Sequence, residues 1–303
     1  MKRAPAHLER KLKHPFYAPA VYQIAFLQSD AADRAQEVEE SVVHPGLEGE
    51  MLELEADTAA YSGRLKDARE FSRRAIDSAE RTGDKETAAT YSAISSLREA
   101  LFGNADEARR RVGFWIGRSS GRDEQYGVAL ALAFVGDDKR AQALIDDLGK
   151  RFREDTLVQF NFLPTLRAEL AVKRGKPSEA LESLRAATPY ELGQTTASTY
   201  GWTALYPVYV RAEAYLLAHQ GAEAASEFQK IVDRRGIVVS DPIGALAHLQ
   251  LGRASRRSEK RPRQELLTGI SSSSGRMPTR ISRCSGKPRR NTRSCAEELR
   301  HDG

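Results

Sequence analysis

The stretch Phe102–Arg111, with the sequence FGNADEARRR, contains a glycine that is followed five residues later by an alanine. The same step occurs three more times, with four mostly polar residues between the glycine and the alanine. The four pairs are Gly63 and Ala68, Gly103 and Ala108, Gly136 and Ala141, and Gly175 and Ala180. A step that recurs four times at fixed spacing indicates one structural element used repeatedly.

Apolar residues recur around each glycine at intervals of three and four, which is the spacing of one helix face. Near Gly136, for example, Val128, Leu132 and Val135 precede the glycine and Ile145 follows it at the same period. No alternating run of β-branched or aromatic residues competes as a strand. The pattern predicts helix, turn, helix, and therefore an all-α fold.

The glycine and the alanine have separate roles in this hairpin. Glycine ends the first helix because it adopts the left-handed conformation without a Cβ penalty. Asp, Asn, Lys or Ser then begins the second helix. We expect the alanine to lie where the two helices cross, since a small side chain lets them approach closely.

The four glycines are 40, 33 and 39 residues apart, close to the ~34-residue tetratricopeptide period. A fifth unit is predicted around residues 205–232, where His219 replaces the glycine. Its repeat positions are Ala212, Tyr215, Ala224 and Phe228.

Two further units are expected at the ends of the repeats. Val21–Ser41 is predicted as an earlier unit with Asp30 at the glycine position, and Asp241–Ala254 as the first helix of a last unit. The sequence thus predicts a continuous right-handed α-solenoid of about six tetratricopeptide-like hairpins.

Several segments resemble the C-terminal tetratricopeptide region of bacterial serine/threonine protein kinases of the eukaryotic type. They include EADTAAYSGRL, SLREALFGNADEAR, GRDEQYGVALALAFVGD, ALYPVYVRAEAYLLAHQGAEAASEFQKI and DPIGALAHLQLGRA, and the resemblance covers residues 8–254. In that family a kinase domain precedes the repeats. The resemblance therefore implies a fragment of a signalling protein, whose repeats contribute partner binding or self-association.

The chain contains no kinase motif set. The Gly-rich loop, the strand lysine, the H-R-D loop and the D-F-G site are all missing, and GRD at Gly121–Asp123 lacks the histidine. GRSSG at Gly117–Gly121 matches the G-x-S-x-G nucleophile elbow of hydrolases, which requires a preceding strand. Because the repeat register makes the preceding segment a helix, we expect no enzyme activity.

No cofactor or metal site is predicted either. The six histidines are scattered, and no two have helical metal-ligand spacing. The two cysteines, Cys284 and Cys295, have no further Cys or His at zinc spacing.

Charge divides the chain into two parts. Residues 255–303 hold 13 Lys and Arg against 5 Asp and Glu, whereas residues 1–254 hold 34 against 37. We therefore expect a repeat domain at 1–254 and a basic, Ser/Arg-rich, disordered tail at 255–303.

The longest apolar run, Val128–Val135, is far shorter than the ~20 residues that span a bilayer. The chain is expected to be soluble and cytoplasmic, without a membrane segment.

Stacked helix pairs form a superhelix whose first helices line a concave face, and such a face captures a protein or peptide ligand. The predicted function is thus a non-catalytic protein–protein interaction module. Candidate peptide-groove residues are the polar or aromatic ones on predicted first helices: Arg98, Gln125, Asn161, Arg167, Tyr209 and Arg211. The fifth unit also contains an aromatic cluster, which consists of Tyr200, Trp202, Tyr206, Tyr209 and Tyr215. It has two interpretations, since it could pack between repeats or form part of the groove. The sequence leaves the partner and the oligomeric state open.

The alternative is a repeat-containing regulator whose basic tail binds nucleic acid. Phosphate binding through the tail would weaken steeply with salt and disappear when residues 255–303 are deleted. This alternative ranks second because the tail has no recognition-helix pattern and the repeat part is slightly acidic.

The tail departs from the repeat register. A continued register requires a glycine at 259, an alanine at 264 and an aromatic residue at 268, where the chain has Glu259, Gln264 and Thr268. The frame that starts on the third base of each codon permits a residue of the required kind at all three positions. We therefore expect the residues from about Ser255 onward to be a frameshifted translation. The alternative is a genuine basic, disordered tail, and resequencing the gene near codon 255 distinguishes the two.

Overall fold

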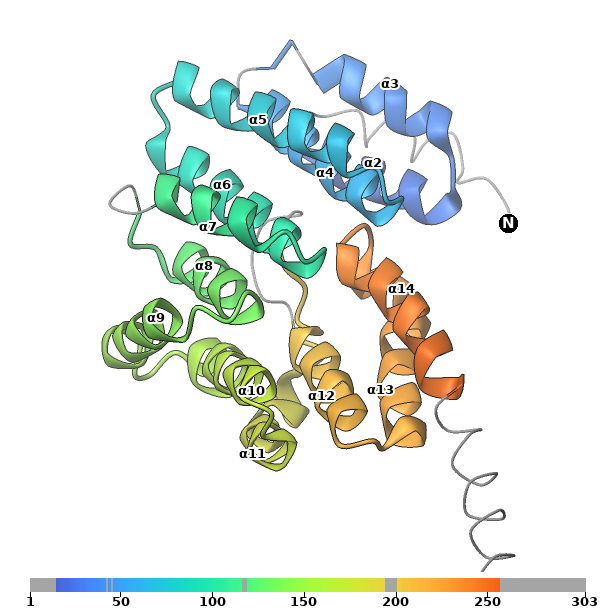
Figure 1. Ribbon diagram of the computed structural model, residues 1–303. Coiled ribbons are helices and arrows are strands. Elements are labelled where there is room, and N and C mark those ends of the chain that lie inside the picture. The colour runs from blue at the N-terminus through green and yellow to red at the C-terminus, as the bar shows by residue number, and fades with distance from the viewer. Residues whose placement is uncertain (1–14, 42, 45, 116–118, 194–200, 257–303) are drawn as a thin grey trace, which may run out of the picture. The chain divides into compact units, whose positions relative to one another are not determined.

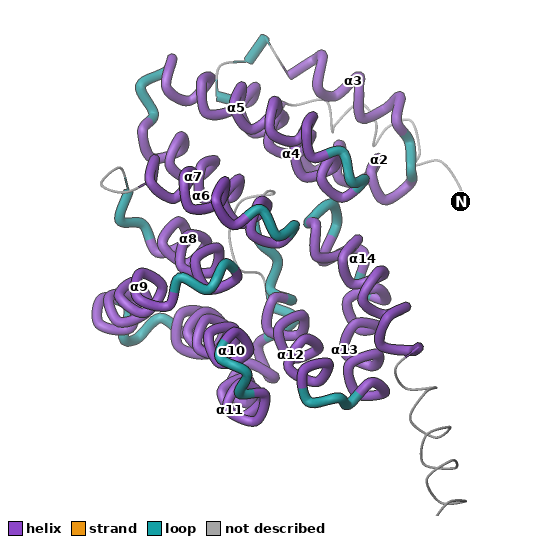
Figure 2. Tube along the Cα trace, in the orientation of Figure 1, coloured by secondary structure: helices purple, strands orange, loops and turns teal. Residues whose placement is uncertain are grey.

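The computed structural model describes residues 15–41, 43–44, 46–115, 119–193 and 201–256. Every regular element in these ranges is helical, and no strand occurs among them (Figures 1 and 2). The prediction of an all-α fold is therefore confirmed.

The helices follow one another as pairs. The first helices of the pairs are α2 (Ala18–Gln28), α4 (Leu47–Tyr61), α6 (Lys85–Leu101), α8 (Arg122–Phe134), α10 (Leu163–Lys173) and α12 (Tyr206–Leu217). The second helices are α3 (Ala31–Ser41), α5 (Leu65–Arg81), α7 (Ala105–Trp115), α9 (Asp138–Arg151), α11 (Pro177–Ser183) and α13 (Gly221–Asp233). The short elements are the 3₁₀ helices η1 (Pro15–Tyr17) and η3 (Leu184–Tyr190), the π-helical turn η2 (Val158–Phe162) and α14 (Arg235–Val238). A further helix covers residues 242–256.

Each first helix packs against its own second helix and against the first helix of the next pair. In Figure 1 the pairs therefore follow one another around the molecule, from α2 and α3 to α12 and α13. The segment Asp241–Ala254, expected as another first helix, is helical from residue 242 onward.

The turn within a pair is set by a left-handed residue and two backbone hydrogen bonds. Gly136 has φ 70°, and its N–H donates to the carbonyl of Ala133 at 3.0 Å. The next N–H, from Asp137, donates to Leu132 O at 2.9 Å. This is the Schellman arrangement, which satisfies the last carbonyls of the helix. The same pair of bonds occurs at Gly63, Gly103 and Gly175, all with positive φ.

Two pairs make this turn without glycine. His219, with φ 59°, occupies the expected position in the α12–α13 turn. In the α2–α3 turn the left-handed residue is Ser29, with φ 60°, whereas Asp30 accepts the N–H of Asp33 at 3.0 Å and caps α3. The expectation that Asp30 stands at the glycine position is therefore wrong by one residue. The hydrophilic side chains of both Ser29 and Asp30 made the two assignments indistinguishable in the sequence.

We predict that Gly136→Ala lowers the free energy of unfolding by about 1–2 kcal/mol, because the left-handed conformation is costly with a Cβ atom. No atom lies within 4 Å of a Cβ built at this position, so steric clashes do not contribute. The matched variant is Gly113→Ala, at an equally open position inside α7. It should stabilise the protein by about 0.5–1 kcal/mol, because alanine is the better helix former. Urea denaturation measures both, and changes of equal sign would contradict the prediction.

The alanines that follow the turn are fully buried. The exposed fraction is at most 1% for Ala68, Ala108, Ala141, Ala180 and Ala224. Ala68 of α5 belongs to one apolar cluster with Ala59 and Ala60 of α4. Small residues of both helices thus meet next to the turn, as we expect for the place where the two helices cross.

Replacing Ala141 with leucine is expected to cost about 1–3 kcal/mol of stability, because extra methylenes in a filled site force the paired helices apart. Ala180→Leu should behave in the same way. The control is Ala143→Leu, since Ala143 is exposed on the same helix. Thermal denaturation followed by circular dichroism reads out both, and an unchanged melting temperature for Ala141→Leu would show that this alanine does not lie at a crossing.

The two ends of the described chain meet. Arg235 Nη2 lies 3.5 Å from the carbonyl oxygen of Leu27 on α2. At the start of the last helix, Gly244 is so close to Tyr61 of α4 that a Cβ atom on Gly244 would lie 2.9 Å from the ring. The helix pairs therefore form one compact unit, in which the segment after α13 contacts the first two pairs.

Within the described ranges, no helix is both long enough and apolar enough to cross a membrane. The helix at 242–256 continues two residues past the predicted domain boundary at Ala254. The expectation of a disordered, frameshifted tail falls on residues 257–303, which lie outside the described residues.

Candidate functional site

The structure buries five of the six predicted groove residues. Exposed fractions are 4% for Arg98, 2% for Gln125, 0% for Asn161, 3% for Tyr209 and 8% for Arg211. Only Arg167, on α10, is exposed. The expectation that these residues line an open groove therefore disagrees with their burial. The cause is that the first helices are covered on nearly all sides, so that their polar residues are buried as well.

Arg98 joins three helices through its guanidinium group. Its Nη2 atom lies 2.7 Å from Glu53 Oε2 and 2.8 Å from Asp57 Oδ1, both on α4. Its Nη1 atom donates to Ser72 Oγ of α5 at 2.6 Å. Burial, together with the charges of Glu53 and Asp241, raises the pKa of Asp57 to about 7, although Arg98 acts in the opposite direction. These groups form a buried network that holds the second and third pairs together.

The other buried candidates have partners inside the chain. Gln125 donates to Asp147 Oδ2 at 2.9 Å and accepts from Arg151 at 3.0 Å, which ties α8 to α9. The guanidinium of Arg211 binds Glu227 of α13 at 2.8 Å and also Glu191. These contacts connect neighbouring elements and indicate a structural role.

The aromatic residues of the fifth unit pack between helices. Tyr209 meets the rings of Phe134 on α8 and Phe228 on α13 edge to face, at centroid distances of 6.3 and 5.7 Å. Tyr206 is buried as well, and Tyr215 is half-buried against the core. These contacts agree with the interpretation that the cluster packs between repeats. Tyr200 lies outside the described residues.

A second charge cluster, around the fully buried Glu169, lies between α10 and α12. Lys173 Nζ is 3.1 Å from Glu169 Oε1, and Glu213 is the other carboxylate beside this lysine. Burial raises the pKa of Glu169 above its ordinary 4.5, and the charge of Glu213 raises it further against the opposing effect of Lys173. One lysine thus faces two carboxyl groups, and the folded chain favours keeping a proton on the pair.

Glu169→Gln is expected to stabilise the protein at pH 8, on the order of 1–3 kcal/mol, and to have little effect below about pH 4.5. The folded state holds the Glu169 proton in a pH range where the unfolded state has lost it. The stability of the wild-type protein therefore falls as the pH rises above 4.5, the ordinary pKa of glutamate. Glutamine removes this pH dependence. Urea denaturation at several pH values tests it, with the exposed Glu182→Gln as control. An effect independent of pH would show that Glu169 is ionised in the folded state.

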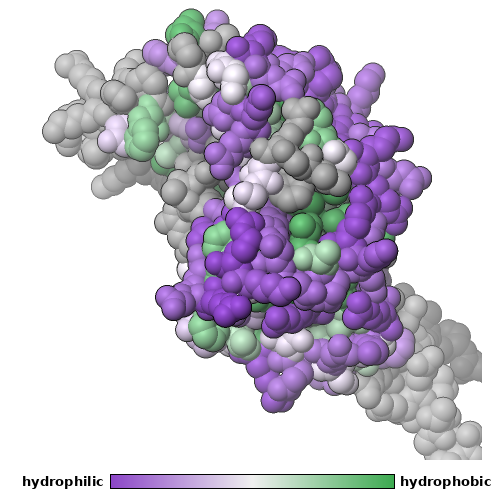
Figure 3. All heavy atoms as spheres, turned by 90° about the vertical axis from the view of Figure 1, so that its left-hand side faces the viewer, coloured by the Kyte–Doolittle hydropathy of each residue, from purple (hydrophilic) through white to green (hydrophobic). Residues whose placement is uncertain are grey.

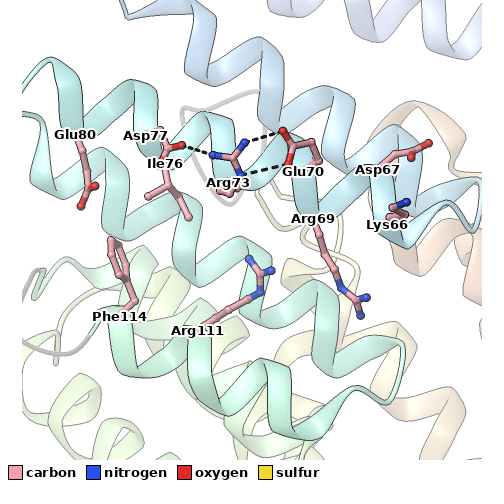
Figure 4. Close-up of a pocket in the computed structure, with 10 residues that line it drawn as sticks. All are labelled: Lys66, Asp67, Arg69, Glu70, Arg73, Ile76, Asp77, Glu80, Arg111 and Phe114. Atoms are coloured by element: carbon pink, nitrogen blue, oxygen red, sulfur yellow. Dashed lines mark hydrogen bonds and ion pairs between the residues drawn. The ribbon is translucent and has the colours of Figure 1, made fainter.

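The outer surface carries a groove between α5 and α7, with a volume of about 730 Å³. Figure 4 shows the side chains of α5 along one wall and those of Arg111 and Phe114 on α7 opposite them. Ile76 and Phe114 supply the apolar part, and both are half-buried. The remaining lining residues are charged: Lys66, Asp67, Arg69, Glu70, Arg73, Asp77, Glu80 and Arg111.

Ion pairs fix several of the charged groups in the groove. Arg73 binds Glu70 and Asp77, both at 2.7 Å. The guanidinium of Arg69 makes two hydrogen bonds with Glu99 of α6, at 2.7 and 2.8 Å. The end of the groove at Asp77 and Glu80 is acidic (Figure 4). The side of the molecule that Figure 3 shows is otherwise largely hydrophilic, with small hydrophobic areas.

Sequence reasoning missed this groove. The residues that line it lie on second helices. The charged residues of each helix, taken alone, have the pattern of an ordinary solvent-exposed helix face. The available signal was the apolar pair Ile76 and Phe114, placed at the same end of two successive second helices.

The part of the chain that the structure describes contains no group of three or more His, Cys, Asp and Glu residues that could hold a metal ion. The segment before GRSSG is the helix α7 through Trp115, and α8 begins at Arg122. The strand that a nucleophile elbow requires is therefore replaced by a helix at those residues.

No protein-family model matches the chain, and a search of curated proteins gives no significant match. The fold and the groove define an all-helical, repeat-like chain of helix pairs with a charged groove on its second helices.

Proposed function

We propose that this chain is a non-catalytic protein–protein interaction module, built as a right-handed solenoid of tetratricopeptide-like helix pairs. The repeated turn at Gly63, Gly103, Gly136 and Gly175 and the buried alanines after it support this architecture. The sequence resemblance supports a place in a signalling protein of the bacterial serine/threonine kinase type.

The groove between α5 and α7 is the observation that carries the proposal. It is open to solvent, in contrast to the interior faces of the first helices, and it combines Ile76 and Phe114 with charged walls. Two neighbouring helices with an apolar strip between them form the kind of groove that receives a helix.

The partner that fits is an amphipathic helix of another protein. Its apolar residues would pack on Ile76 and Phe114, and a basic residue would face the acidic end at Asp77 and Glu80. Charge complementarity of this kind sets the orientation of a bound helix and raises its association rate. A second copy of this chain is the competing occupant.

The test reverses the acidic end with the double substitution Asp77→Lys and Glu80→Lys. The matched control, Glu179→Lys with Glu182→Lys, makes the same change at the same spacing on α11. Both pairs lie at the surface, where ion pairs contribute little stability.

Proteins retained by the immobilised wild-type chain are identified, and the bound segment of each is synthesised and titrated. We expect the Asp77/Glu80 variant to bind at least tenfold more weakly, the control to bind as wild type, and the segment to gain helical circular dichroism on binding. Equal binding by all three chains would overturn the groove as the contact site. Sedimentation of the wild-type chain over a range of concentrations tests the second copy as occupant.

The nucleic-acid alternative depends on the basic tail, which lies outside the described residues. The test is the salt dependence of nucleic-acid binding, measured with and without residues 255–303.

A further inference from the structure

Residues 201–205, which lead into α12, lie against the first helices α6 and α8. They are not helical, yet Trp202, Ala204 and Leu205 are buried, with exposed fractions of 5%, 2% and 0%. Figure 1 shows this segment running between α8 and the last helices toward the start of α12.

Trp202 lies directly on the backbone of α8. A Cβ atom built on Gly127 would be 2.3 Å from Cζ3 of the indole, so only glycine leaves room for this ring. The indole also meets Tyr126 edge to face at 5.8 Å, and Tyr126 stacks on Phe162 at 3.7 Å. Gly127 and the two aromatic rings thus form a pocket for a flat aromatic side chain.

The backbone of the same segment is held by side chains. Asn161 Nδ2 donates to the carbonyl of Ala204 at 3.3 Å, and the N–H of Thr203 donates to Asp241 Oδ2 at 3.3 Å. Asn161 is fully buried, and its Oδ1 atom has no hydrogen-bond partner. Gly201 lies near Ile94 of α6, since a Cβ atom built on it would be 3.9 Å from Ile94 Cδ1.

Residues 201–205 are therefore bound as a peptide ligand would be. Their main chain is recognised by an asparagine and an aspartate, and their tryptophan fills a pocket over Gly127. The contacts come from α6, α8, η2 and Asp241. A bound peptide whose backbone is held by side chains can be replaced by another with the same chemistry, because main-chain groups are alike in all peptides.

We propose that residues 201–205 occupy, within the same chain, a peptide site on α6, α8 and η2, and that an extended partner segment with a tryptophan among small, uncharged residues displaces them. This site is separate from the α5–α7 groove, so the failure of either proposal leaves the other standing.

The test uses a fluorescein-labelled peptide, GWTALY, which copies residues 201–206. Trp202→Ala empties the pocket, and we expect this variant to bind the peptide at least tenfold more tightly than wild type. Adding Gly127→Ala to that variant places a methyl group in the pocket and should abolish binding. The peptide GATALY should not bind either. Fluorescence anisotropy measures all four combinations.

Equal binding by wild type and Trp202→Ala, binding that survives Gly127→Ala, or no binding to a folded Trp202→Ala chain would each overturn the proposal. Helical circular dichroism and a cooperative melting transition establish that each variant is folded.

A second measurement needs no variant. In the wild-type chain, hydrogen exchange should be at least a hundredfold faster at the amides of Thr203 and Leu205 than in the middle of α8, because a displaceable segment opens without unfolding the helices. Equal exchange rates would show that residues 201–205 open only with the whole fold, which would overturn the proposal even if Trp202→Ala does not fold.

Discussion

Arg98→Met is expected to lower the free energy of unfolding by about 3–5 kcal/mol. The substitution removes the positive charge that Glu53 and Asp57 share in the interior, and breaking a buried ion pair from one side leaves uncompensated charge. Methionine fills much of the volume, so the loss reports on the charge and the hydrogen bonds. Without the guanidinium group, the carboxyl groups of Glu53 and Asp57 take up protons more readily. The loss of stability should therefore become smaller as the pH falls from 8 to 5.

Urea denaturation at both pH values measures the effect. The matched control is Arg73→Met, because Arg73 also pairs with two acidic residues but is exposed on α5. We expect the control to change stability by less than about 0.5 kcal/mol. A similar loss for the two variants would mean that the Arg98 cluster is accessible to water.

Phe162→Ala should cost a comparable amount, about 3–5 kcal/mol, which is typical of a large aromatic side chain removed from a core. Phe162 is fully buried and stacks on Tyr126 with an angle of 6° between the rings. Its loss would leave a cavity against Tyr126 and remove support from the ring that contacts Trp202.

Phe160 provides the control two residues earlier. It stacks on Tyr190 at 4.9 Å but is 40% exposed. Phe160→Ala should therefore cost less than about 1 kcal/mol, because most of its surface is already in water or at the boundary. Thermal denaturation separates the two, and equal melting temperatures would place Phe162 outside the core.

The helix pairs could be predicted from the sequence because their signals are local. Gly136 and Ala141 lie five residues apart, and the apolar period on each side of them spans one helix. Ser29 was harder to assign, since a serine takes the left-handed conformation only when the surrounding turn demands it. His219 was assigned from the register of the unit around it and not from its own propensity.

The burial of the predicted groove residues could not be read from the sequence. Arg98 is a charged residue on a helix, and the two carboxylates that neutralise it are 41 and 45 residues away. Nothing near it in the chain distinguishes it from the exposed Arg167. The groove between α5 and α7 and the pocket over Gly127 likewise arise from residues that only the packed repeats bring together.

The first two pairs contact the segment after the last pair, through Tyr61 and Gly244 and through Leu27 and Arg235, and this has a consequence for cooperativity. An open array of repeats interacts only with its nearest neighbours, so that it can fray from either end one unit at a time. Here the two ends of the array stabilise each other, and melting either end exposes the other. Under a mechanical load or in denaturant, such a chain should therefore resist stepwise unravelling and lose all its pairs in a single transition.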